Sequence, residues 1–173
     1  NGLGIFAINS STGAISVADK TNLDREAISS VTLTVQVSDN GPGSARTGTA
    51  SVTINVTDEN EFNPTVSGGP FSLAENSANG TAVGSASGTD GDATNSVLSY
   101  SITGGNSLAI FAINSSTGAI IVTDTTNLDR EVISSVTLTV QVSDNGPGSA
   151  RTGTTSVTIN VTDVNEFNPT VSG

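Results

Sequence analysis

Cysteine, histidine, methionine and tryptophan are all missing from this chain of 173 residues. Without cysteine there are no disulfides, and zinc sites built on thiolates are excluded. Without histidine, the Ser-His-Asp and Cys-His nucleophile systems and the usual transition-metal sites are excluded as well. The sequence therefore argues against an enzyme.

Positive charge and long apolar runs are also scarce. Five Lys and Arg stand against sixteen Asp and Glu, and the net charge of −11 disfavours binding to nucleic acid or anionic lipid. No run of about 18 apolar residues is present, so no membrane insertion is expected in this segment. The first residues lack the basic and long apolar parts of a signal peptide, so any export signal is expected outside this sequence.

The residues that are abundant favour β-structure. Thr, Ser, Val, Asn and Gly dominate, aromatic residues are limited to five Phe and one Tyr, and no stretch shows helical periodicity. Residues 135–144 and 156–163 alternate apolar and polar side chains around a segment rich in turn residues, which predicts a hairpin. Further strands are predicted at 71–76, 80–87, 98–103 and, around a Ser-Thr-Gly turn, 110–123.

The sequence repeats with a period of 105 residues. When Asn1 is aligned with Asn106, 60 of 68 paired positions are identical. This period is the length of one β-sandwich domain. We therefore expect an all-β chain of tandem seven-stranded, antiparallel Greek-key β-sandwiches. Residues 1–63 would be the C-terminal part of one repeat, residues 64–168 a complete repeat, and residues 169–173 the start of the next.

The predicted strand directions divide the acidic residues between the two ends of a repeat. The chain enters the complete repeat near Pro64, at what we call its upper end, and successive strands alternate in direction. The upper cluster is then expected to contain Asp90, Asp92 and Asp144. The lower cluster, at the opposite end, is expected to contain Glu75, Asp129, Glu131, Asp163 and Glu166.

Consecutive repeats would bring a lower end against an upper end. In this chain, the lower end of the first repeat is expected to supply four acidic residues to such a junction, opposite the upper cluster: Asp24, Glu26, Asp58 and Glu61. Carboxylates about 5 Å apart repel one another by several kcal/mol at an effective dielectric constant near 20. Ca²⁺ accepts six to eight oxygen ligands and would relieve this repulsion, whereas Mg²⁺ demands tighter octahedral geometry. The sequence therefore predicts Ca²⁺ as the cofactor.

Five motifs in this order resemble those of cadherin repeats, and the resemblance covers the whole chain. They are "LAEN" at 73–76, "LDRE" at 23–26 and 128–131, "TDGD" at 89–92, "VSDNG" at 37–41 and 142–146, and the linkers "DENEFNP" at 58–64 and "DVNEFNP" at 163–169. Two positions depart from the family linker, because Glu61 and Glu166 replace an Asp and Phe62 and Phe167 replace an Asn.

The resemblance implies a ligand set for each calcium ion. Two ions on the first repeat's side of the junction would be bound by Asp24, Glu26, Asp58, Glu61, Asp92 and the carbonyl of Glu59. A third ion would be bound by Asn60, the carbonyl of Phe62, Asp90, Asp92 and Asp144. Asn95 resembles a further carbonyl ligand, although its spacing after Asp90 is shorter than in the family.

The expected function is mechanical: calcium would rigidify the inter-repeat junctions of an extracellular, cell-surface adhesin. Near-identical repeats, absent cysteine and scarce lysine resemble large bacterial surface adhesins more than animal cadherins. Three roles stay open: a stiff spacer, a module that binds other repeats or surface glycans and proteins, and a subunit of an extracellular filament or sheath completed by neighbouring chains. Paired carboxylates also suggest a glycosidase, but their recurrence at repeat ends argues for architecture.

Overall fold

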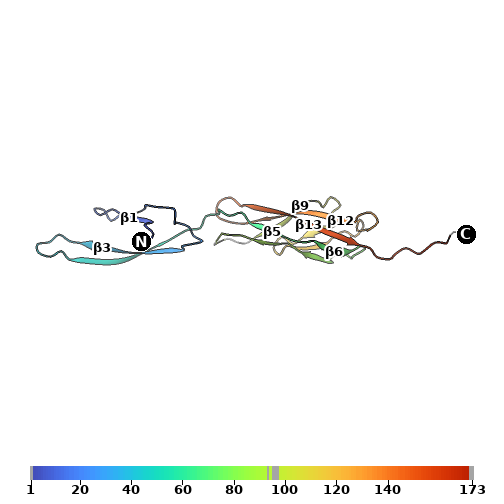
Figure 1. The fold of residues 1–173 in the computed structure, drawn as a ribbon, viewed down its shortest axis with the longest axis horizontal. Coiled ribbons are helices and arrows are strands. Elements are labelled where there is room, and N and C mark those ends of the chain that lie inside the picture. Colours follow the sequence, from blue (N-terminus) through green and yellow to red (C-terminus); the bar gives the residue numbers. More distant parts are fainter. Residues whose placement is uncertain (1, 93, 95–97, 172–173) are drawn as a thin grey trace. The chain divides into compact units, whose positions relative to one another are not determined.

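In a computed structural model, the chain forms two compact units, Asn1–Glu59 and Asn60–Gly173 (Figure 1). The structure describes residues 2–92, 94 and 98–171. Within them every regular element is a β-strand. None of the described residues forms a helix long and apolar enough to cross a membrane. The predicted division into repeats at residues 64 and 169 stays a prediction.

The second unit consists of a four-stranded sheet, a three-stranded sheet and a separate strand pair. The four-stranded sheet has the order β6 (Phe71–Ala74), β13 (Thr152–Thr162), β12 (Ser135–Ser143) and β9 (Ser99–Gly104). The three-stranded sheet has the order β10 (Phe111–Ile113), β11 (Ala119–Val122) and β7 (Ala82–Ser85). The pair consists of β5 (Thr65–Ser67) and β8 (Ser87–Thr89).

The predicted hairpin is confirmed as β12 and β13, which pair from Ser135↔Asn160 to Ser143↔Thr152. Strand β13 begins at Thr152, earlier than the predicted start at residue 156, because Thr152–Thr155 find partners along β12. On its other edge β13 pairs in parallel with β6, and β12 pairs with β9. Strand β5 was not predicted, since three residues carry too little periodicity.

The core of the second unit lies between its two larger sheets. Leu138, Val140, Val157 and Ile159 come from the hairpin and are fully buried against Ile120 and its neighbours. Burial of such a side chain contributes about 1.5–3 kcal/mol. This core fixes the hairpin, and the hairpin in turn places Asp144 and Asp163 at opposite ends of β12 and β13.

The first unit contains two hairpins. Strands β1 (Phe6–Ile8) and β2 (Ile15–Val17) form one, and β3 (Ser30–Ser38) and β4 (Thr47–Asn55) form the other. Its buried apolar residues are Ile5, Phe6 and Leu33. This core is smaller than that of the second unit, which contains the strands of residues 65–104 in addition to the stretch that matches the first unit.

Candidate metal centre

The upper cluster lies where two loops of the second unit converge. Asp90 and Asp92 follow β8, and Asp144 follows β12. Each of the three offers one carboxylate oxygen, and these oxygens lie within 4.8 Å of one another. Asp92 and Asp144 are almost fully buried, with exposed fractions of 7% and 5%. The structure thus brings together the three residues that strand direction assigned to this end.

Backbone and side-chain donors hold the upper cluster in place. The backbone N–H of Asp92 donates to Asp90 Oδ1 at 2.9 Å. Asp144 Oδ1 accepts from the backbone N–H of Arg151 at 2.9 Å and from Asn60 Nδ2 at 3.1 Å. Burial alone would oppose ionisation of Asp144, but these hydrogen bonds and the charge of Arg151 outweigh it, and its pKa lies below the ordinary value. Asp144 is therefore ionised at neutral pH.

Four oxygens of this region are buried without a hydrogen-bond donor among the described residues. They are Asp90 Oδ2, Asp92 Oδ2, Asp144 Oδ2 and Asn60 Oδ1. An unsatisfied buried polar atom costs about 1–3 kcal/mol, and more when it is charged. Carboxylate and amide oxygens are the ligands that Ca²⁺ accepts. The donor set therefore fits a hard divalent cation.

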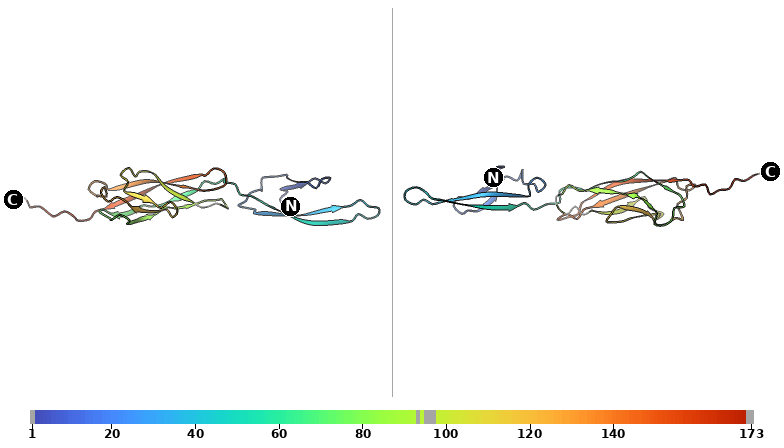
Figure 2. Two further views of the ribbon diagram at one scale, coloured as in Figure 1. Left: turned by 180° about the vertical axis from the view of Figure 1, so that it is seen from behind. Right: turned by 90° about the horizontal axis from the view of Figure 1, so that it is seen from below.

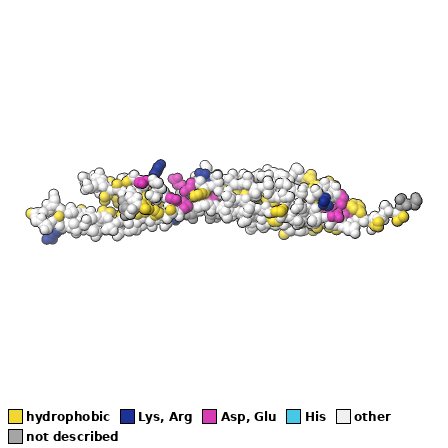
Figure 3. Space-filling view, viewed as in Figure 1, with side chains coloured by type: hydrophobic (Ala, Val, Ile, Leu, Met, Phe, Trp, Pro, Cys, Tyr) yellow, Lys and Arg dark blue, Asp and Glu magenta, His cyan; other side chains and the backbone are white. Residues whose placement is uncertain are grey.

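The lower cluster lies at the opposite end of the second unit and centres on Glu75. Glu75 is 2% exposed, and its two carboxylate oxygens accept the backbone N–H groups of Arg130 and Val164, each at 2.6 Å. Figure 3 shows acidic side chains gathered where the C-terminal segment leaves this unit. Two overlapping groups of ligand atoms lie within 4.8 Å: Glu75 with Asp129 and Glu131, and Glu75 with Asp163 and Glu166.

The carboxylates of the lower cluster differ in their ionisation. The backbone N–H donors of Arg130 and Val164 lower the pKa of Glu75. In contrast, desolvation of its carboxyl group and the negative charges of Glu75 and Glu166 raise the pKa of Glu131 to about 7. Mutual repulsion of this kind is relieved by a proton or by a cation.

The other predicted ligands are distributed over both units. Asp24 follows β2, and its Oδ1 accepts the backbone N–H of Glu26 at 2.9 Å. The equivalent contact in the second unit joins Glu131 N to Asp129 Oδ1, also at 2.9 Å. The remaining predicted ligands are Asp58 and Glu59, which end the first unit, Glu61 and Phe62, which lie near the start of the second, and Asn95, which lies outside the described residues.

Sequence reasoning missed the role of Arg151. Its Nε donates to the carbonyl oxygen of Asn60 at 2.7 Å, and its Nη1 donates to Asn63 Oδ1 at 3.2 Å. The sequence did contain one indication of this position. Because β12 and β13 pair as a hairpin, Arg151 lies opposite Asp144 where the two strands meet the turn. Only the fold shows that a linker lies within reach of this side chain.

Comparison with known proteins gives consistent matches. The family model described as "Cadherin domain" matches residues 1–57 and 70–162. Protocadherin Fat 1 of Homo sapiens is 40% identical over 172 residues, which are 98% of this chain and 4% of that protein. The chain thus spans only a small fraction of that relative.

Solved structures match over nearly the whole chain. The crystal structure of mouse Cadherin-23 EC22-24 has a TM-score of 0.74 at 31% identity and covers 94% of this chain and 51% of its own. The cis-dimer structure of Protocadherin gammaB7 EC3-6 has a TM-score of 0.73 at 25% identity, with 97% and 42% covered. The predicted all-β, β-sandwich class is confirmed by these likenesses.

Proposed function

Because the chain belongs to the cadherin family, we propose that it is a calcium-binding segment of an extracellular, cell-surface adhesion protein. In this proposal calcium stiffens an array of repeats and thereby supports cell adhesion. The near identity of the two repeats supports a parent with a long tandem array, of the kind found in bacterial surface adhesins. Because adhesion rather than catalysis is the common role of the relatives, no enzymatic activity is proposed.

The observation that carries the proposal is the set of buried oxygens without donors at Asp90, Asp92, Asp144 and Asn60. Solubility alone would place carboxylates in water, where each oxygen is hydrated. Asp92 and Asp144 are instead buried beside one another, at a cost that only a cation or a proton offsets. The lowered pKa of Asp144 favours the cation over the proton for that residue at neutral pH.

Different residues would have different roles in such a calcium site. Asp90, Asp92 and Asp144 would supply negative charge, Asn60 Oδ1 a neutral oxygen, and the backbone N–H groups of Arg151 and Asp92 would hold the carboxylates in place. Bound Ca²⁺ would supply the positive charge that balances them. The lower cluster would present Glu75, Asp129, Glu131, Asp163 and Glu166 to the following repeat in the same way.

Calcium titration by calorimetry tests this function with a matched pair of variants. Asp144 and Asp39 occupy equivalent positions, and the Oδ1 of each accepts the Arg N–H seven residues on at 2.9 Å. Asp144 belongs to the upper cluster, whereas Asp39 is exposed and lies outside every acidic group found among the described residues. We expect Asp144→Asn to weaken calcium binding by about tenfold or more and Asp39→Asn to leave it unchanged.

Chelation provides the second readout. Removal of calcium should lower the melting temperature, because the carboxylates within each acidic cluster then repel one another. It should also broaden the distribution of molecular dimensions that small-angle scattering measures. If chelation changes neither quantity, or if Asp144→Asn and Asp39→Asn titrate alike, the calcium function is wrong.

A second candidate function is that of a filament or sheath subunit, in which strands of a neighbouring repeat complete the first unit. Two grooves of the first unit, each lined in part by apolar side chains, favour it. One, of about 110 Å³, is lined by residues that include Phe6, Leu33 and Val35. The other, of about 250 Å³, includes Phe6, Leu23 and Ile54. Sedimentation velocity distinguishes the two candidates, because a subunit forms concentration-dependent polymers and a spacer stays monomeric.

A further inference from the structure

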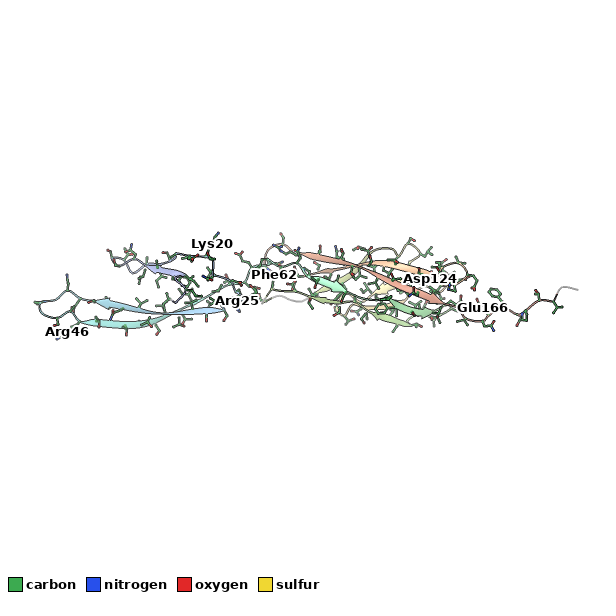
Figure 4. All side chains as sticks on the ribbon, in the orientation of Figure 1. Lys20, Arg25, Arg46, Phe62, Asp124 and Glu166 are labelled. Carbon is green, nitrogen blue, oxygen red and sulfur yellow. The ribbon has the colours of Figure 1, made fainter. Side chains whose placement is uncertain are left out.

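The side chain of Phe62 lies against the backbone of Gly91, between the two aspartates of the upper cluster. A Cβ atom at position 91 would lie 2.8 Å from Phe62 Cγ and 3.0 Å from Cδ1. The first distance is shorter than Cβ contacts in proteins, so a side chain at position 91 would force the ring to shift. Phe62 is 45% exposed, and one side of the ring is covered by this loop. Figure 4 places Phe62 at the start of the second unit.

The backbone on either side of Phe62 is bound to the same loop. The N–H groups of Glu61 and Phe62 both donate to Asp92 Oδ1, at 3.2 and 3.3 Å. Pro64 is fully buried, and a side chain at Gly153 would clash with its carbonyl oxygen. The segment is therefore packed onto the unit at several successive residues.

Arg151 also binds this segment, at the residues on either side of Glu61 and Phe62. Its guanidinium binds the carbonyl of Asn60 and the side chain of Asn63. Asn60 Nδ2 in turn donates to Asp144 Oδ1 and to the carbonyl of Ser149. A Cβ at Gly146 would clash with the Asn60 side chain. These contacts fix the amide of Asn60 so that its Oδ1 stays buried near the carboxylates.

The same five residues occur again as Asn165–Pro169 and serve as an internal comparison. There the phenylalanine, Phe167, is 72% exposed, and the proline, Pro169, is exposed rather than buried. The C-terminal segment extends away from the sandwich in both views of Figure 2. The packing of Phe62 and Pro64 therefore rests on contacts with the rest of the second unit, among them those with Gly91, Asp92 and Arg151.

From these contacts we propose that Phe62 and Arg151 are positioning residues, which hold Asn60–Pro64 on the second unit through protein contacts alone. They act through Asn60: its oxygen is set beside the upper cluster before a divalent cation arrives. The role in cation binding rests on the proposed calcium function, whereas the packing of the linker does not.

Amide hydrogen exchange in calcium-free buffer, followed by NMR on the full chain, tests the packing. The N–H groups of Glu61 and Phe62 should exchange at least about tenfold more slowly than those of Glu166 and Phe167, their sequence equivalents. Phe62→Ala should remove this difference, and Phe62→Leu, which retains an apolar contact with Gly91, should restore most of it. Phe167→Ala is the matched control and should change nothing at residues 61 and 62.

Calcium titration of the same variants tests the positioning role. We expect Phe62→Ala and Arg151→Gln each to weaken binding by about tenfold, as is typical when a group that orients a ligand is removed. Phe167→Ala should have no effect on the upper cluster.

Equal exchange rates at residues 61–62 and 166–167 in the unmodified chain would overturn the proposal. So would an unchanged calcium affinity in Phe62→Ala. If exchange is slow at residues 61 and 62 but calcium does not bind at all, the packing of the linker is confirmed and the proposed calcium function is wrong.

Discussion

The first and second units present the same strand in two environments. Residues 30–38 and 135–143 have identical sequences and form β3 and β12. Yet Val37 is 70% exposed, whereas its equivalent Val142 is fully buried. The alternating pattern therefore specifies which face of a strand is apolar, and other strands decide whether that face is covered.

Neighbouring strands account for the difference. In the second unit, β12 is paired with β13 and β9, and β13 is paired with β6 as well. Among the described residues of the first unit, β3 and β4 pair only with each other. The apolar side chains of β3 therefore line open grooves, while those of β12 lie within a closed core. Tertiary context thus overrides an identical local pattern.

The largest expected contrast comes from placing a polar side chain on this face. Val142→Asn should destabilise the second unit by about 3 kcal/mol or more, because the amide loses water without gaining a partner. Val37→Asn should change stability by less than about 0.5 kcal/mol, because position 37 is already solvated. Scanning calorimetry of both variants measures the difference. Equal destabilisation would show that the first unit is closed in solution.

A smaller and equal effect is expected where the two units share a local contact. Asn9 Oδ1 accepts the backbone N–H groups of Ser11 and Thr12 at 2.9 and 3.0 Å. Asn114 makes the same two contacts in the β10–β11 turn, at the same distances. Asn9→Ala and Asn114→Ala should therefore each cost about 1 kcal/mol, as measured by urea unfolding. If the two variants lose very different amounts of unfolding free energy, the packing of the flanking strands also affects the stability of the turn.

The smallest effect concerns pH and Glu131 in calcium-free buffer. Its folded-state pKa of about 7 lies above the ordinary 4.5, so the folded state binds more protons between these values. The stability it contributes is complete below about pH 4.5 and is lost as pH rises through 7. Solvent screening keeps the change small, because Glu131 is exposed. Melting temperature should therefore fall slightly from pH 5 to pH 7.5.

Glu131→Gln is the control for this prediction and should flatten the pH dependence. The lowered pKa values of Glu75 and Asp144 act in the opposite direction, but only below about pH 4.5, and so do not cancel it. A melting temperature that rises across this range in calcium-free buffer would contradict the assignment.

Much of the fold was predictable because strand and turn signals are local. The hairpin of β12 and β13 follows from alternation and turn residues, and the segment 110–123 does form two strands around its turn. The predicted strand at 80–87 is divided between β7 and β8, which belong to different sheets. Such a switch depends on what each half packs against, and nothing in "GTAVGSAS" marks it.

The acidic clusters were predictable because strand direction fixes which end each carboxylate reaches. Asp90, Asp92 and Asp144 meet as expected, although 53 residues lie between the outer two in sequence. The contacts of Phe62 and Arg151 were not predictable, because the packing of a ring on Gly91 is a property of assembled loops. The ligand roles of all these residues stay predictions that calcium titration will test.

The parallel pairing of β6 with β13 has a mechanical consequence. Phe71–Ala74 and Ile159–Thr162 lie side by side and run in the same direction, near the beginning and the end of the second unit. Tension applied to the two ends of this unit would slide these strands along one another instead of unzipping them. The hydrogen bonds of the ladder would then bear the load simultaneously, and the unit would yield only when several rupture at once.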